Sequence, residues 1–446
     1  MIGKIKTYLR QLTWLERIWL LAPIFIWFSY QPQISLGGDN TMNYELSLTL
    51  IYAVVLALVG LPTIWRARHE LMRDKYVWLV TVFVGWTGLS VLWSANQLRG
   101  FLTFGITGVL WLIFLAAYAR KKRLRELLPA LTKVLIASSV AVCLLALGQM
   151  ILGVYIQSRQ SLWLCAGCVA GQFGFVRPNL FVIEPQFLGS MLLAPMLIMT
   201  YRLIERPRNW RDSVVFILLL TTLGLTLSRG AIYAGAVGIA IMWLTVRGRW
   251  LNKLASVDLM IISVILCLAV QGGLAAINPH ITETFWGAVT KSVDHLTMGI
   301  FDLQATPTTT QEKADVTTPV YDGYVAESTD VRVNLTKTAL ASWTSQDLTG
   351  RLFGVGLGSA GKAMAQHIGS NYEKEIVQNE YAEVLLERGL VGLLLLIAVI
   401  AMTFYRLRHQ KWLWAILAAF LVQYCFFSGL PNALHVYLII CWLLAL

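Results

Sequence analysis

Apolar runs of about 20 residues recur along nearly the whole chain, separated by polar stretches. The hydrocarbon core of a bilayer is roughly 30 Å thick, and a helix of about 20 apolar residues crosses it. We therefore expect an all-α polytopic membrane protein with about 12 transmembrane helices. The predicted spans cover residues 18–30, 44–65, 76–94, 101–119, 130–154, 179–201, 212–228, 230–246, 257–276, 389–405, 412–428 and 431–446.

Two connecting segments are longer than a turn: residues 155–178, and the segment of about 100 residues between the ninth and tenth spans. The middle of the long segment is rich in Thr and Pro, which predicts an exposed, mobile excursion. From about Asp330 onward, and again in KAMAQHIGS, the spacing predicts helix. Asn379 is a candidate cap for a helix that continues into the tenth span. We expect three parts: transmembrane helices in 1–276, a partly helical periplasmic loop region in 277–388, and transmembrane helices in 389–446.

Composition and charge agree with a membrane protein. Of the 446 residues, 57% are hydrophobic and 13% are charged, with a mean hydropathy of +0.64; soluble domains carry about 25% charged residues. The net charge of +12 comes from short Lys and Arg clusters between apolar runs. With a cytoplasmic N-terminus these clusters all fall on the cytoplasmic side, as the positive-inside rule requires. A nucleic-acid partner is excluded, because no basic soluble module is present. The first apolar run lacks a small-residue cleavage site and is interpreted as a span.

The six cysteines fall into two groups. Cys165 and Cys168 form a CAGC in the 155–178 segment, which is compatible with a disulfide or with free thiols, whereas a zinc site would need two further ligands. The other four lie in apolar runs, where a thiol usually serves as a small buried hydrophobe: Cys143, Cys267, Cys425 and Cys441.

Three arginines are expected on the external side, and Arg229, in a short turn, runs against the orientation rule. Arg229 lies in the turn TLSRGAIYAG, Arg332 in the helical part of the long segment, and Arg177 before the sixth span, with Glu184 inside that span. Guanidinium groups match phosphate oxygens and remain charged at neutral pH, so converging arginines suit a phosphate or diphosphate at the headgroup level. The simpler alternatives are a snorkelling side chain for Arg229, a solvated helix face for Arg332, and a structural ion pair between Arg177 and Glu184.

Acidic side chains precede the tenth span in VQNEYAEVLLERGLVGLLLL. Glu380, Glu383 and Glu387 share one helix face, which is either functional or simply turned to water. Upstream, GVGLGSAG contains a G-x-G-x-x-G pattern, but dinucleotide binding needs a strand–turn–helix unit. We interpret these glycines as a hinge or a close backbone approach. His367 is a candidate base, with a solvated side chain as the simpler alternative.

The order of these motifs resembles the O-antigen ligase and O-antigen polymerase superfamily of bacterial envelope enzymes. The matching pieces are TLSRG, Arg332 followed by TALASW, LFGVGLGS, and QNEYAEVLLERGLVGLLLL, within about Thr226 to Leu396. The resemblance implies transfer of a glycan from a polyprenyl-diphosphate carrier to a glycan or lipid-linked acceptor. The reaction would occur at the periplasmic face of the inner membrane, among membrane lipids, without a cofactor or a metal.

The resemblance also suggests roles for single residues. Arg229 and Arg332 match the arginines that contact the diphosphate. The chain departs from the family pattern at Gln378, where the family has histidine, because glutamine can orient a hydroxyl but cannot accept its proton. The base is then His367, Glu380 or Glu383, or Gln378 only orients the acceptor. Substrate-binding residues are expected to be Arg177, Asn379, Tyr381 and Glu383.

The leading interpretation is therefore a membrane glycosyltransferase of the ligase or polymerase type. A lipid-linked sugar flippase or another polytopic transporter is the main alternative. Transporters often contain internal repeats and polar groups near the middle of the membrane. No such repeat is found in the sequence. The candidate polar residues are predicted to cluster at the external edge of the membrane and not near its middle.

Overall fold

The computed structural model describes residues 12–38, 43–156, 177–206, 209–277, 325–368, 376–428 and 433–446, together with residues 286, 289, 290, 293 and 430. The chain forms two compact units. The first unit comprises Met1–Ser138, Val237–Val246 and Asn334–Leu446, and the second comprises Ser139–Ala236 and Arg247–Val333.

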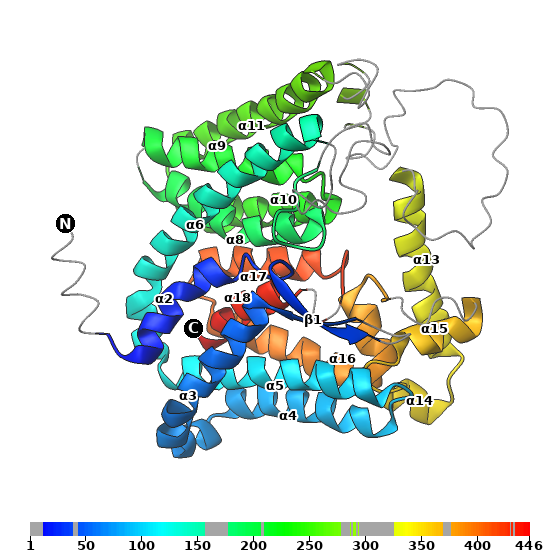
Figure 1. Ribbon diagram of the computed structural model, residues 1–446. Coiled ribbons are helices and arrows are strands. Elements are labelled where there is room, and N and C mark those ends of the chain that lie inside the picture. Colours follow the sequence, from blue (N-terminus) through cyan, green and yellow to red (C-terminus); the bar gives the residue numbers. More distant parts are fainter. Residues whose placement is uncertain are drawn as a thin grey trace, which may run out of the picture. The chain divides into compact units, whose positions relative to one another are not determined.

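In the first unit, α5 (Gln97–Ala119) packs along α3 (Leu48–Arg73) and α4 (Lys75–Leu89) (Figure 1). Helix α16 (Glu380–Arg406) packs on α4, and α18 (Leu434–Ala445) packs on α5. The unit also contains α2 (Trp14–Phe25), β1 (Gln33–Gly38), β2 (Asn43–Ser47), η1 (Ser90–Trp93), α14 (Leu348–Phe353), α15 (Ala360–Ile368), α17 (Lys411–Gln423), and the first part of α6 (Lys121–Ile156).

In the second unit, α8 (Pro185–Glu205), α9 (Trp210–Leu225) and α11 (Trp250–Ile277) pack against one another (Figure 1). The unit also holds the later part of α6 and the first parts of α10 (Arg229–Thr245) and α13 (Val325–Thr344). Helix α8 is its most enclosed member, because 89% of its most apolar stretch is buried. The corresponding value for the other long apolar helices is 28% to 39%. Polar residues in the first turn of α8 are therefore held in a packed setting.

The helices confirm the prediction of an α-helical membrane protein. Each of the 12 predicted spans overlaps a helix in the part of the chain that the structure describes. Seven of these helices are long and apolar enough to cross a bilayer, namely Leu48–Arg73, Lys75–Trp93, Gln97–Ala119, Lys121–Leu152, Pro185–Glu205, Trp250–Leu274 and Glu380–Arg406. Helices α10, α17 and α18 are shorter apolar helices.

Within the long segment, the helices expected from the sequence are confirmed as α13 and α15, and Asn379 caps α16 as predicted. The Thr- and Pro-rich stretch and the CAGC motif lie outside the described residues. Three of the four cysteines in apolar runs are buried, but Cys425 is exposed because it falls in the turn after α17.

A two-stranded antiparallel sheet corrects the purely helical expectation. Strands β1 and β2 pair with Gln33 opposite Ser47 and Ile34 opposite Leu46. The predicted second span began inside this hairpin, whereas the helix starts at Leu48, where the Ser47 hydroxyl accepts a hydrogen bond from a first-turn N–H. Alternating apolar residues are compatible with a strand and with the first turn of a helix. The Ser47 cap, and not the apolar pattern, therefore marks where α3 begins.

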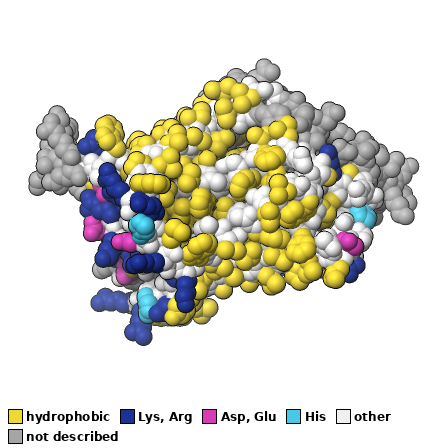
Figure 2. Space-filling view, turned by 90° about the horizontal axis from the view of Figure 1, so that it is seen from below, with side chains coloured by type: hydrophobic (Ala, Val, Ile, Leu, Met, Phe, Trp, Pro, Cys, Tyr) yellow, Lys and Arg dark blue, Asp and Glu magenta, His cyan; other side chains and the backbone are white. Residues whose placement is uncertain are grey.

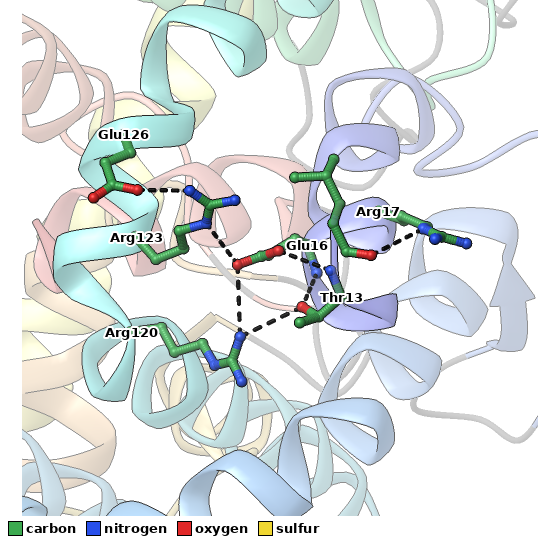
Figure 3. A network of polar contacts seen from close by, with 7 residues as sticks. Thr13, Glu16, Arg17, Arg120, Arg123 and Glu126 are labelled. Carbon is green, nitrogen blue, oxygen red and sulfur yellow. Dashed lines mark hydrogen bonds and ion pairs between the residues drawn. The ribbon is translucent and has the colours of Figure 1, made fainter. Parts of the chain in front are cut away.

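Charged side chains gather at one end of the face shown in Figure 2, beside a broad hydrophobic area. Figure 3 shows a polar network in the first unit that joins α2 to the junction of α5 and α6. The Glu16 carboxylate accepts hydrogen bonds from the Thr13 N–H at 2.8 Å and from Arg123 Nε at 2.8 Å, and lies 3.6 Å from Arg120. Burial by itself would raise the pKa of Glu16, but the Thr13 and Arg123 hydrogen bonds and the Arg123 charge outweigh it, so its pKa lies below the ordinary value.

Replacing Glu16 with glutamine should lower the free energy of unfolding by about 2 kcal/mol, because a buried charge-assisted contact is lost. Since the folded-state pKa of Glu16 is depressed, its contribution is present above the unfolded-state pKa and disappears as the pH falls through the folded-state value. Unfolding of the detergent-solubilised protein measures this loss. Glu126→Gln is the matched control, since that side chain is 63% exposed and also pairs with Arg123. Equal losses for the two variants would contradict the prediction.

Candidate functional site

The turn between α9 and α10 buries an arginine at the start of a helix. Leu227 adopts a left-handed backbone with φ of 49°, and Ser228 Oγ accepts a hydrogen bond from the Ala231 N–H in the first turn of α10. Arg229 is the first residue of α10 and is only 6% exposed. A snorkelling side chain would extend out of the protein, so that alternative for Arg229 is wrong.

Helix α8 lies against this turn through a glycine. A Cβ atom on Gly189 would come within 2.7 Å of the Ala231 Cβ and 3.2 Å of the Thr226 Oγ1. The absence of a side chain at this position therefore allows α8 and the start of α10 to approach closely.

Arg332 reaches the same region from α13. Its Nη2 donates a hydrogen bond of 2.9 Å to Oε1 of Gln186, a buried residue in the first turn of α8. Arg332 is itself partly buried. The solvated-face alternative for Arg332 is therefore wrong, because the guanidinium is bound to a protein partner.

Arg177 is bonded to the backbone of the same turn. Its Nε donates a hydrogen bond of 3.1 Å to the carbonyl oxygen of Thr226. The loop that carries it is fixed by Gln149 of α6, whose Oε1 accepts from the backbone N–H groups of Asn179 at 3.1 Å and Leu180 at 3.0 Å. Arg177 lies outside any helix or strand, and these contacts hold it in position.

We call Arg177, Arg229 and Arg332 the arginine cluster. Burial lowers the pKa of Arg177 to about 10; the Glu184 carboxylate opposes this shift, while Arg332 and Arg229 add to it. Burial also lowers the pKa of Arg332, again against the effect of Glu184. Both arginines remain protonated at neutral pH. The described residues thus bring three mutually repelling cations together, with Glu184 as the acid whose charge acts on two of them.

The simpler alternative for Arg177, a structural ion pair with Glu184, is not found among the described residues. Within the described ranges no hydrogen bond or ion pair within 4.0 Å joins the Glu184 carboxylate to another side chain. Glu184 is exposed and precedes the first residue of α8. Gln186, Gly189 and the Thr226 carbonyl were not singled out from the sequence. The signal that could have found Gln186 is its polar side chain at the start of an apolar run.

In the first unit, the glycine-rich segment makes the close backbone approach expected of it. Gly354, Gly356 and Gly358 have positive φ values of 77°, 95° and 80°. A Cβ on Gly354 would lie 2.4 Å from the Glu387 carbonyl carbon, and one on Gly356 would lie 2.5 Å from the Ser94 Cα. The segment therefore fits directly against α16 and η1.

Glu387 occupies the ring of backbone donors that this segment creates. Its Oε1 accepts hydrogen bonds from the N–H groups of Gly358 at 2.9 Å and Ala360 at 3.2 Å, at the start of α15. Such a nest of N–H groups is an anion site. Here the protein's own carboxylate fills it, so the glycines position α15 on α16 and are not available to a nucleotide phosphate.

The other two glutamates on this helix face are also buried. Glu380 and Glu383 are 7% and 9% exposed. The Ser428 hydroxyl donates to Glu383 Oε2, and the Glu380 N–H donates to the Tyr424 carbonyl at 2.9 Å. The alternative of a face turned to water is therefore wrong, because these acids lie inside the first unit.

The segment before α16 carries an unusual glutamine. Gln378 has a positive φ of 59°, and its buried Oε1 has no hydrogen-bond partner among the described residues. Asn379 Oδ1 accepts from the Ala382 N–H at 3.1 Å, and its Nδ2 donates to the Cys425 carbonyl at 3.4 Å. The Tyr381 hydroxyl donates to the Leu421 carbonyl at 2.8 Å. Asn379 and Tyr381 thus hold the start of α16.

His367 is exposed near the end of α15, and its Nε2 lies 3.3 Å from the Ser345 hydroxyl. Its hydrogen bond therefore goes to a residue outside the acidic face of α16. For metals, the described portion of the chain contains no group of three His, Cys, Asp or Glu side chains that could hold an ion.

The helices define a multi-pass membrane protein, and its second unit contains the arginine cluster. Residues 214–397 match the family model for O-antigen ligase, which supports the resemblance to the O-antigen ligase superfamily. The matched range includes Arg229, Arg332, and the segment from Gln378 to Glu387. No curated protein matches the chain. This match, together with the apolar helices, supports a multi-pass membrane glycosyltransferase of the O-antigen ligase type.

Proposed function

We propose that the protein transfers a glycan from a polyprenyl-diphosphate carrier to the hydroxyl of an acceptor sugar. The observation that supports this most strongly is the arginine cluster, in which Arg177, Arg229 and Arg332 come together from three segments of the second unit. Such a grouping of cations is unfavourable by itself and becomes favourable when a multivalent anion binds.

In this reaction the bond between the anomeric carbon and the diphosphate oxygen breaks, and its electron pair remains on the diphosphate. The acceptor oxygen forms the new glycosidic bond and loses its proton. Negative charge therefore grows on the leaving group, where preorganised guanidinium groups stabilise it. The arginine cluster supplies this stabilisation without a metal ion.

The external face is the proposed location of the reaction. The basic clusters of the sequence are assigned to the cytoplasmic side, which leaves the turn with Arg229 on the other side.

A transfer assay with the purified protein in vesicles tests the proposal. The vesicles contain a polyprenyl-diphosphate glycan and either a lipid-linked core or a second lipid-linked repeat as acceptor. A new glycosidic bond supports transfer, and the acceptor that reacts separates a ligase from a polymerase. Movement of the donor across the bilayer without a new bond would instead establish the transporter alternative.

Replacing His367 with alanine should leave the transfer rate within about threefold of the original, because this exposed side chain bonds only to Ser345 in the described structure. Glu380→Gln should lower the rate by less than about tenfold, since glutamine preserves the size of this buried side chain. Single-turnover rates measure both effects. A loss of more than about 100-fold in either variant would identify that residue as the general base.

A further inference from the structure

The first turn of α8 holds Arg332 through a neutral side chain. Oε1 of the buried Gln186 accepts a hydrogen bond of 2.9 Å from Arg332 Nη2. Gln186 is itself fixed, because it is the second residue of α8 and its carbonyl accepts the Ser190 hydroxyl at 2.7 Å. The bond therefore directs one edge of the Arg332 guanidinium toward α8. It does not cancel the charge of the arginine, because an amide carries none.

The same part of α8 lies against the segment that carries Arg229. Gly189 follows Gln186 by three residues, so the two share one face of the helix. A Cβ on Gly189 would lie 2.7 Å from the Cβ of Ala231, which is two residues after Arg229. Gln186 therefore binds Arg332 one helical turn away from the contact between α8 and the start of α10.

The amide at position 186 has a chemical consequence that a carboxylate would not have. Glutamate has the same length and would accept the same hydrogen bond from Arg332, in its stronger charge-assisted form. It would also neutralise the guanidinium, which would then attract a phosphate less strongly. A contact that served only to pack α13 on α8 would be better made by the acid. Glutamine instead orients the guanidinium and keeps its positive charge, which is what an anion-binding site requires.

We propose that Gln186 is a positioning residue of the arginine cluster, which holds the Arg332 guanidinium for a diphosphate without neutralising it. The inference rests on the proposed function, because it takes the diphosphate of the lipid carrier as the ligand of the cluster. The bond to Gln186 uses one N–H of the guanidinium. The other N–H groups of Arg332 are then the donors for the phosphate oxygens, and their direction is set by the bond to α8.

Gln186→Glu tests this role with the full chain in vesicles. The probe is a polyprenyl diphosphate without a sugar, and the uncharged polyprenol of the same length is the control ligand. Diphosphate affinity and the single-turnover rate of glycan transfer should each fall at least about tenfold, because the introduced carboxylate pairs with Arg332. Thermal stability should be unchanged or higher, since the ion pair ties α13 to α8 more strongly. A residue with only a packing role would not separate stability from diphosphate affinity in this way.

Gln186→Met is the second variant, because it keeps the size of the side chain and removes the acceptor. We expect diphosphate affinity to fall about three- to tenfold, since the guanidinium is no longer oriented, whereas binding of the polyprenol should not change. The same change made together with Arg332→Ala is the matched control. In that background it should alter diphosphate affinity by less than about threefold, because the side chain through which Gln186 acts is absent.

Unchanged diphosphate affinity in both single variants would overturn the proposal, because Gln186 would then only pack α13 on α8. Equal losses from Gln186→Met with and without Arg332 would also overturn it, since Gln186 would then not act through that arginine. If the unchanged protein binds the diphosphate but transfers no glycan, the proposed function is contradicted while the role of Gln186 in anion binding stands. Failure of the unchanged protein to bind the diphosphate would contradict both.

Discussion

Arg229→Ala and Arg332→Ala should each lower glycan transfer at least about 100-fold, the size of effect seen when a preorganised donor to a developing oxyanion is removed. Arg229 is buried at the start of α10, and Arg332 is held by Gln186. We expect each to stabilise the negative charge that grows on the diphosphate during transfer. Removing either arginine leaves the negative charge on the diphosphate without a cationic partner. Insertion of the protein into the membrane should not change.

Matched variants separate this effect from a general loss of charge. Arg211→Ala removes an exposed arginine that lies over the ring of Trp210, at the start of α9, and should leave transfer unchanged. Lysine at position 229 or 332 should restore part of the rate, because lysine keeps the charge but lacks the planar fork. Rates and the affinity for the donor are measured in the same vesicles. Full transfer by both alanine variants would exclude the assigned role of the arginine cluster.

Gly389→Ala and Gly354→Ala should destabilise the first unit by about 3 kcal/mol or more, combining backbone strain with overpacking. Gly389 interrupts α16 with φ of 67°, and a Cβ there would lie 2.2 Å from the Leu352 carbonyl oxygen. A Cβ on Gly354 would lie 2.5 Å from the Gly389 nitrogen. Because both neighbours are backbone atoms, neither can move aside without shifting α16 or the segment between α14 and α15.

Gly105→Ala is the control for these two substitutions. It lies within α5, and a Cβ there would meet no atom within 4 Å. Alanine also favours a helix more than glycine does, so this variant should be neutral or slightly more stable. Thermal unfolding in detergent and the yield of folded protein measure the difference. Equal stability of the three variants would show that the glycines are not required for the close approach.

The helices were predictable because their signal is local. A membrane span needs a sufficient length of apolar sequence, and this property can be read from about 20 consecutive residues. Asn379 as a helix cap and the glycines of GVGLGSAG as a close approach were also predictable, since each depends on the chemistry of a short stretch. The hairpin at β1 and β2 was missed because its alternating apolar residues also suit a helix start.

The roles of the charged residues depended on distant partners. Arg332 and Gln186 are 146 positions apart in the sequence, and their hydrogen bond follows from the packing in the second unit. Glu380, Glu383 and Glu387 share a face in any helix, but burial of that face depends on α15, on Ser428 and on the turn at Tyr424. Sequence spacing alone left water and protein as equal alternatives for this face.

The sequence by itself determined that the protein is a helical membrane protein and which of its motifs resemble the O-antigen ligase superfamily. The tertiary structure decided which ionisable side chains form hydrogen bonds within the protein and which remain exposed. It placed the Glu387 carboxylate on the backbone N–H groups of the glycine segment and left Glu184 exposed just before α8. The physical reason is that the type of residue fixes its charge and its hydrogen-bonding groups. The elements packed around the residue decide whether it is buried and whether those groups find partners.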